Sequence, residues 1–228
     1  MKSKKVILFI VEGITDKNSL SLILSKLLSN NHIKFHIVGG DVTTNKNTTI
    51  QNCITKVNDE INKFLSISKF KKTDILEVIH LVDTDGAYVE DKFVKLDNTD
   101  NIIYKLDCML TNKVDLIIER NNKKASILDK LYTNSKISSI PYCMYYFSCN
   151  LEHVLHNEQN LDDNLKLRYS YDFEDEYYGR ELQFKSFMQD SIFSVKGDYK
   201  ETWDFIKKDN NSLNSFSNFG LFFDKKLE

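Results

Sequence analysis

The chain has 228 residues, a formal net charge of −2 at pH 7 and 41% hydrophobic residues. This composition is ordinary for a folded globular protein, and the length suffices for one large domain or for a domain with a small accessory region. The near-neutral charge excludes a protein-wide basic field, but it is compatible with a local basic patch for nucleic acid.

Cysteine spacing and apolar runs indicate the compartment. The four cysteines show no CxxC spacing, so we expect reduced, buried thiols. No apolar run reaches the ~18 residues that a membrane span needs. The first apolar run stops at Glu12 without the small-residue cleavage site of a secretory signal. The sequence therefore predicts a cytoplasmic protein with no membrane association.

The first part of the chain alternates buried-strand patterns with helical patterns. The strands near Val6 and near Ile75 are continuous apolar runs, which are typical of parallel strands buried on both faces. A β-α-β-α-β order predicts right-handed crossovers and a parallel sheet. The predicted elements are strand 5–11, helix 16–28, strand 32–38, helix 48–67 and strand 75–82.

The second part of the chain has weaker patterns. Residues 87–99 indicate an irregular excursion, and residues 101–106 a short strand. A helix over 113–132, a strand over 142–147 and a helix from Leu151 to His156 follow. From about Leu161 the pattern is helical and rich in aromatic and acidic residues, which favours an accessory region packed on the core. We predict an α/β domain over 1–157 and a helical region over 158–228.

Acidic residues follow two of the predicted buried strands. Glu12 and Gly13 come directly after the first strand, and Asp83-Thr84-Asp85-Gly86 comes after the third. Ligands of open α/β sheets lie outside the carboxyl ends of the strands, so these carboxylates are expected to converge. Carboxylates in one cleft repel each other, and hard oxygen ligands favour Mg²⁺ or Mn²⁺ as the neutralising cation.

Other acidic and histidine residues have a functional and a structural interpretation. Asp16 lies one helical turn after Glu12 and is either an outer metal ligand or a helix cap. Glu152 is either a further metal ligand or a solvated residue at a helix start, and the Asp-Gly dipeptide alone is typical of turns. His153 and His156 lack an HExxH pattern, so a zinc site is not favoured.

Four basic residues are candidates for contacts with nucleic-acid phosphates, because cations supply much of nucleic-acid affinity. The alternative is that they belong to solvated helix faces. These candidates are Lys17, Arg120, Lys123 and Lys124.

The motifs Val11-Glu12-Gly13-x-x-Asp16 and Asp83-x-Asp85-Gly86, each after a strand, resemble the Toprim family. That fold is shared by topoisomerases, bacterial primases and the overcoming-lysogenization-defect (OLD) type nucleases. The segment from Tyr146 to His156 is similar to a segment of RloB-like Toprim proteins. The resemblance implies a Toprim-like Rossmannoid parallel sheet flanked by helices, with a C-terminal helical subdomain.

The resemblance also implies a chemistry. Glu12 would act as a general acid/base or a metal ligand, and Asp83 with Asp85 would hold Mg²⁺ or Mn²⁺. Glu152 and Asp16 complete the set of candidate metal ligands. The implied function is a Mg²⁺-dependent nuclease acting on DNA or RNA in anti-phage defence by abortive infection. A partner ATPase is expected, because the chain contains no GxxxxGK[ST] motif.

Two other functions compete with nuclease activity. One is a non-catalytic regulatory or interaction protein that has kept the fold. The other is nucleotidyl transfer as in primases, which ranks low because no zinc-binding module accompanies the motifs. The choice between DNA and RNA, and the oligomeric state, are open at this point.

Overall fold

The computed structural model describes residues 5–28 and 32–226. The chain forms two compact units, each built from three segments. The first comprises Met1–Val82, Ser126–Tyr145 and Leu167–Phe184, and the second comprises Asp83–Ala125, Tyr146–Lys166 and Lys185–Glu228. The boundary expected after residue 157 falls inside the Tyr146–Lys166 segment.

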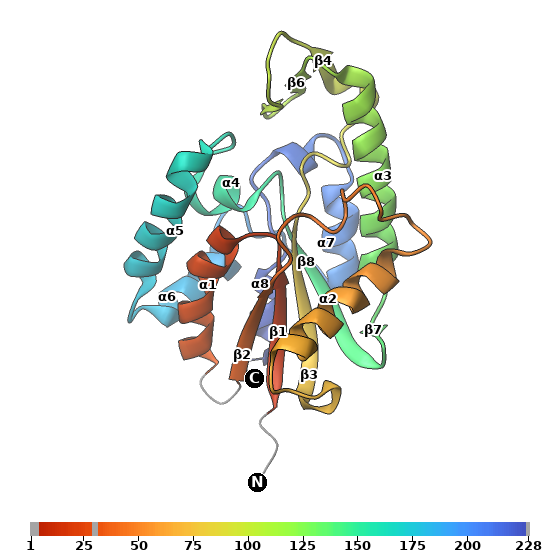
Figure 1. Cartoon of the computed structure of the whole chain (residues 1–228). Coiled ribbons are helices and arrows are strands. Elements are labelled where there is room, and N and C mark those ends of the chain that lie inside the picture. Colours follow the sequence, from red (N-terminus) through yellow and green to blue (C-terminus); the bar gives the residue numbers. More distant parts are fainter. Residues whose placement is uncertain (1–4, 29–31, 227–228) are drawn as a thin grey trace. The chain divides into compact units, whose positions relative to one another are not determined.

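A five-stranded sheet forms the centre of the first unit. Its order is β2-β1-β3-β8-β7, and β1 pairs in parallel with both β2 and β3 (Figure 1). The expected α/β class is confirmed, but the sheet is mixed, because β7 pairs antiparallel with β8. The strands are β1 (Val6–Val11), β2 (His32–Ile37), β3 (Ile75–Asp83), β7 (Lys136–Ile137) and β8 (Ile140–Phe147).

Strand β1 is fully enclosed, since all six of its apolar side chains are at most 1% exposed. Each such side chain contributes about 1.5–3 kcal/mol by leaving water, which explains why this run is continuous in the sequence. Helices α1 (Ile14–Leu27) and α2 (Cys53–Ile67) alternate with β1, β2 and β3 in the predicted order. Helix α2 begins five residues later than predicted, because Thr49 and Asn52 exchange hydrogen bonds in a turn before it.

Aromatic residues of the C-terminal half also belong to the first unit. Phe173 of α5 (Asp163–Tyr177) lies 4.9 Å from Tyr177 and 6.1 Å from Phe184 of α6 (Glu181–Asp190), measured between ring centroids. All three rings are buried. These three aromatic side chains therefore act as core.

Glu60 of α2 illustrates how the first unit satisfies a buried charge. Its carboxylate accepts hydrogen bonds from Lys63 Nζ at 2.6 Å and from His36 Nε2 at 3.0 Å. Burial raises the pKa of Glu60, but these hydrogen bonds outweigh it and leave that pKa below its usual value of 4.5. The carboxylate therefore stabilises the fold above about pH 4.5, and the contribution is lost as pH falls through the lowered pKa.

Replacing Glu60 by Gln should lower the free energy of unfolding by about 1–2 kcal/mol at pH 7, because charge-assisted hydrogen bonds are lost. Urea unfolding of the wild type and the variant between pH 3 and pH 7 measures the difference. The two curves should approach each other as the pH falls. A difference that is constant across this range would contradict the role assigned to the carboxylate.

The second unit contains a small sheet of order β4-β6-β5. Its core consists of Val89, Val94, Met109 and Leu213. Of these three strands, only β5 lies within a predicted strand, that over 101–106. Strands β4 and β6 have three residues each, which is too short to show periodicity. The elements are η2 (Asp91–Phe93), β4 (Val94–Leu96), β5 (Ile103–Tyr104), β6 (Met109–Thr111), α4 (Leu151–His156), α7 (Tyr199–Ile206), η3 (Asn211–Leu213) and α8 (Gly220–Lys226).

Two further elements complete the fold. Helix α3 (Val114–Tyr132) contributes to both units, and the short helix η1 (Lys72–Asp74) precedes β3. All four cysteines are buried, as predicted. No helix among residues 5–28 and 32–226 is long and apolar enough to cross a membrane.

The C-terminal segment 211–218 is largely non-helical and bonds to the end of β8. The Tyr146 N–H donates to Asn218 Oδ1 at 2.9 Å, and the Ser148 N–H donates to the Phe216 carbonyl at 2.7 Å. Ser217 Oγ donates to the Tyr146 carbonyl at 2.8 Å. This part of the predicted helical region therefore supports a strand end instead of forming a separate helical layer.

Candidate functional site

The acidic loop after β3 is fixed to the end of β8. Asp83 is the last residue of β3, and the next N–H, that of Thr84, donates to the Phe147 carbonyl at 3.0 Å. Asp85 N–H donates to the Cys149 carbonyl at 2.8 Å. The buried hydroxyl of Thr84 accepts from the Cys149 N–H at 2.9 Å. These hydrogen bonds thus hold the backbone around Asp83 and Asp85 against the end of β8.

The backbone leaves β3 through left-handed conformations. Asp85 has φ 48°, Gly86 has φ 70°, and Cys149 on the adjoining loop has φ 58°. A Cβ at Gly86 would lie 2.8 Å from Met109 Sδ, so both the dihedral angle and the packing require glycine. Left-handed non-glycine residues cost about 1–2 kcal/mol each, and such strain collects at functional sites. Asp85 lies in the turn after β3. The alternation of side chains between the two faces of a strand therefore does not determine where the Asp85 side chain points.

Asp85 is held by two basic residues of α3. Lys124 Nζ lies 2.5 Å from Asp85 Oδ2, and the lysine side chain is 0% exposed whereas that of Asp85 is 24% exposed. Arg120, one helical turn earlier, donates from Nη2 to the Asp85 carbonyl at 2.7 Å. Both residues are candidates for phosphate contacts from the sequence. In the structure they face the acidic turn, and Lys124 is closed off from solvent.

Glu152 joins the same group of charges through a lysine that no sequence pattern singles out. Glu152 is 7% exposed on α4. Burial lowers the pKa of Lys166, but the hydrogen bond to Asp163 and the negative charges of Glu152, Asp163 and Asp83 raise it above its usual value. Lys166 therefore lies within electrostatic range of Asp83 and Glu152, two candidate metal ligands that are 69 residues apart in the sequence.

The charges of the acidic turn also act on Cys149 and Tyr104. Burial raises the pKa of the Cys149 thiol, and the negative charges of Asp85 and Asp83 raise it further. Burial likewise raises the pKa of Tyr104, again reinforced by Asp85. The Tyr104 hydroxyl accepts a hydrogen bond from Arg120 at 3.4 Å. The negative charges of the turn thus act on both the Cys149 thiol and the Tyr104 hydroxyl.

A polar pocket of about 640 Å³ includes Lys166 and Asn150 in its lining. Asn150 Oδ1 caps α4 by accepting from the His153 N–H at 2.8 Å. Asn160 exchanges hydrogen bonds with the Tyr104 backbone at 2.8 and 2.7 Å, which fixes one wall. The remaining lining is Asn101, Ile102, Ile103, Gln159, Leu161, Asp162, Asp163 and Asn164. Its side-chain amides and its partly buried isoleucine and leucine side chains could contact the edges and faces of a nucleotide base.

Glu12 and Asp16 belong to the first unit. Glu12 is the first residue after β1, and its carbonyl accepts the Gly40 N–H at 3.2 Å. Asp16 Oδ2 accepts the Gly13 N–H at 2.9 Å, so this carboxylate stabilises the start of α1 as the structural interpretation expects. Lys17 of α1 and Lys123 of α3 are each partly exposed.

The carboxylates can be tested for their fit to a divalent metal. Among the described residues, no three His, Cys, Asp or Glu side chains gather into a ready metal cage. Mg²⁺ demands less, because it is commonly held by one or two carboxylates together with waters and substrate phosphates. Asp83 and Glu152, whose charges both act on Lys166, offer such carboxylates, whereas the Asp85 carboxylate is paired with Lys124. No protein-family model, curated protein or solved structure matches the chain.

Proposed function

We propose that this protein is a Mg²⁺- or Mn²⁺-dependent nuclease of the Toprim type that hydrolyses phosphodiester bonds in DNA or RNA. The observation that carries the proposal is the acidic turn at the joined ends of β3 and β8. Asp83 and Asp85 lie on this turn, Lys124 pairs with Asp85, and the charges of Asp83 and Glu152 act on Lys166. A carboxylate cluster with two lysines suits a ligand that brings a cation and an anion, which is the composition of metal-bound phosphate.

Each residue has a role in this proposal. Asp83 and Glu152 would hold the metal, and Asp85 would complete the set. A bound Mg²⁺ would polarise a phosphodiester and lower the pKa of a bound water. Lys124 holds Asp85 in position, and Lys166, at a side-chain exposure of 35%, is accessible to a substrate phosphate.

Glu12 is proposed as the general acid/base. Support comes from its position in the fold, because Glu12 directly follows β1, the strand that pairs in parallel with both β2 and β3. Asp16 is proposed as an outer metal ligand, a role for which its hydrogen bond with the Gly13 N–H would have to break. Lys17 and Lys123 are proposed as contacts with the nucleic-acid backbone, whereas Arg120 and Lys124 are proposed as positioning residues for Asp85. A partner ATPase and a role in anti-phage defence belong to the same proposal.

One observation favours the non-catalytic alternative. The Asp85 carboxylate is already neutralised by the buried ammonium of Lys124, so the fold needs no metal to tolerate that charge. A regulatory or interaction protein could keep this ion pair for stability alone. The two functions differ in whether Asp83 and Glu152 bind a cation.

Metal binding and cleavage test the proposal together. Millimolar Mg²⁺ or Mn²⁺ should raise the melting temperature, because a ligand at 100 times its dissociation constant stabilises the folded state by about 2.7 kcal/mol. For a chain of this size that corresponds to a rise of about 5–10 °C. Asp83→Asn combined with Glu152→Gln should abolish the rise, and cleavage of labelled DNA or RNA should disappear with it.

Asp115→Asn is the matched control, because Asp115 is an exposed acidic residue of α3 outside the cluster. It should keep both the metal response and the cleavage. A metal response that survives in the double variant would place the cation elsewhere. A wild-type protein that binds no cation and cuts no substrate, with any ATPase encoded beside it present, would leave the non-catalytic function.

A further inference from the structure

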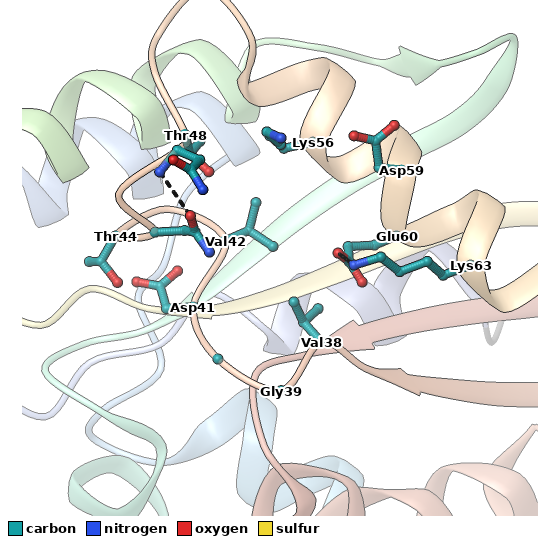
Figure 2. A pocket seen from close by; sticks show the side chains of 13 residues that line it. Val38, Gly39, Asp41, Val42, Thr44, Thr48, Lys56, Asp59, Glu60 and Lys63 are labelled. Carbon is teal, nitrogen blue, oxygen red and sulfur yellow. Dashed lines mark hydrogen bonds and ion pairs between the residues drawn. The ribbon is translucent and has the colours of Figure 1, made fainter.

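A second polar pocket lies in the first unit, at the carboxyl end of β2. It has a volume of about 550 Å³ and is built entirely from residues 38–63, which form the loop after β2 and one face of α2 (Figure 2). Small-molecule sites commonly have this size, and ligands of α/β sheets bind at the carboxyl ends of the strands. The pocket therefore has both the place and the dimensions of a binding site.

The loop that forms one wall is fixed by its own polar groups. Asp41 Oδ1 accepts hydrogen bonds from both the N–H and the hydroxyl of Thr43, each at 2.6 Å. The Thr48 N–H donates to the Asn45 carbonyl at 2.9 Å, a bond drawn in Figure 2. Asn52 Nδ2 donates to the loop carbonyl of residue 47 at 3.0 Å. These bonds preorganise the wall before any ligand arrives.

Four other polar groups of the lining take no part in these loop hydrogen bonds. The ammonium of Lys56, the carboxylate of Asp59 and the hydroxyls of Thr44 and Thr48 line the pocket. Within the described residues, none of these side chains makes a hydrogen bond or an ion pair. Lys56 is half-buried and Thr48 is 1% exposed. These groups are therefore available to bond a ligand that enters the pocket.

The pocket lining presents both a positive and a negative side chain, which suits a ligand that has an anionic group and hydrogen-bond donors. Lys56 and Asp59 are three residues apart on α2, a spacing at which opposite charges can pair, yet the two do not pair. Glu60 does not compete for Lys56, because it bonds Lys63 and His36. A cation and a carboxylate acceptor are thus both presented to the pocket.

We propose that this pocket binds a nucleoside phosphate, independently of the nuclease site. Lys56 meets the phosphate as a point charge, with the Thr44 and Thr48 hydroxyls donating to phosphate oxygens. Asp59 accepts the ribose hydroxyls. Gly39 and Gly40 leave open space beside the backbone, because a Cβ at either position would meet no atom within 4 Å. The volume admits one nucleotide but not a duplex, so the source is a free nucleotide or one unit of a single strand.

Isothermal titration calorimetry tests this site with AMP, UMP, adenosine, inorganic phosphate and a single-stranded adenine hexamer. AMP or UMP should bind, and Lys56→Met should weaken the binding at least tenfold while its apolar stem keeps the packing of α2. Asp59→Asn should weaken nucleotide binding but leave the affinity for inorganic phosphate unchanged. Lys46→Met is the matched control, because Lys46 is exposed on the same loop and does not line the pocket.

The outcomes separate the sources and decide the proposal. Tighter, Lys56-dependent binding of the hexamer would identify a nucleic-acid strand as the source, whereas preference for the mononucleotides would identify a free nucleotide. Binding of inorganic phosphate as tight as that of AMP, or nucleotide affinities unchanged in Lys56→Met, would overturn the proposal. So would the absence of binding for every probe. Circular dichroism of each variant confirms that it is folded.

Discussion

Replacing Glu12 by Gln should lower the rate of phosphodiester cleavage by about 10²- to 10⁴-fold, the usual contribution of general acid–base catalysis. The substitution keeps the shape and the hydrogen-bonding length of the side chain but removes the group that exchanges a proton. Metal binding should largely survive, because Asp83 and Glu152 remain. Single-turnover cleavage of single- and double-stranded DNA and RNA with Mg²⁺ or Mn²⁺ measures the loss.

The matched variant for this experiment is Asp16→Asn. Asp16 accepts the Gly13 N–H at the start of α1, so its replacement should affect stability by a few tenths of a kcal/mol up to about 1 kcal/mol and cleavage much less than Glu12→Gln does. Equal rates in the wild type and in Glu12→Gln would show that another group transfers the proton, and Glu152 is the first to examine.

Replacing Asp85 by Ala should destabilise the protein by about 3 kcal/mol, because removal of one partner from a buried ion pair leaves the other charge uncompensated. Lys124 is 0% exposed and its ammonium lies against the Asp85 carboxylate. For a chain of this length we expect a fall in melting temperature of about 6–12 °C. Repulsion among the acidic residues, considered alone, predicts the opposite sign, so thermal unfolding separates the two effects.

A second substitution shows whether the ion pair is the cause. In Asp85→Ala combined with Lys124→Met both charges of the pair are gone, and stability should return to within about 1–2 kcal/mol of the wild type. Gly86 and the backbone bonds of the turn are unchanged in this variant. An Asp85→Ala protein as stable as the wild type would show that the pair contributes nothing, and the acidic turn would then owe its conformation to the backbone alone.

The first half of the fold could be predicted from the sequence because its signals are local. Strands β1, β2 and β3 and helix α1 begin and end within two residues of the predicted bounds, since long apolar runs and helical spacing are properties of neighbouring residues. Strands β4, β6 and β7 have two or three residues and no period to detect. Their pairing depends on partners that lie up to 15 residues away along the chain.

Likewise, the sequence singles out some residues of the candidate site but not others. Glu12 and Asp83 can be singled out from the sequence because each directly follows an apolar run, and Asp85 lies two residues after Asp83. Lys166 could not, since its relation to Asp83 and Glu152 comes from folding of distant segments. The sequence also cannot tell a lysine that faces solvent from Lys124, which is buried against Asp85, because both occur on amphipathic helices at similar spacing.

The contacts of Ser212 have a consequence for synthesis of the protein on the ribosome. Thr84 Oγ1 donates to the Ser212 carbonyl across 128 residues of sequence, and the Cys149 N–H donates to the same carbonyl. A nascent chain that ends before this residue has the acidic turn but not the backbone that braces it, and such distant contacts form late. The turn that carries Asp83 and Asp85 therefore gains its native bracing only after residues 211–218 leave the ribosome, so the order of synthesis itself delays the completion of this turn.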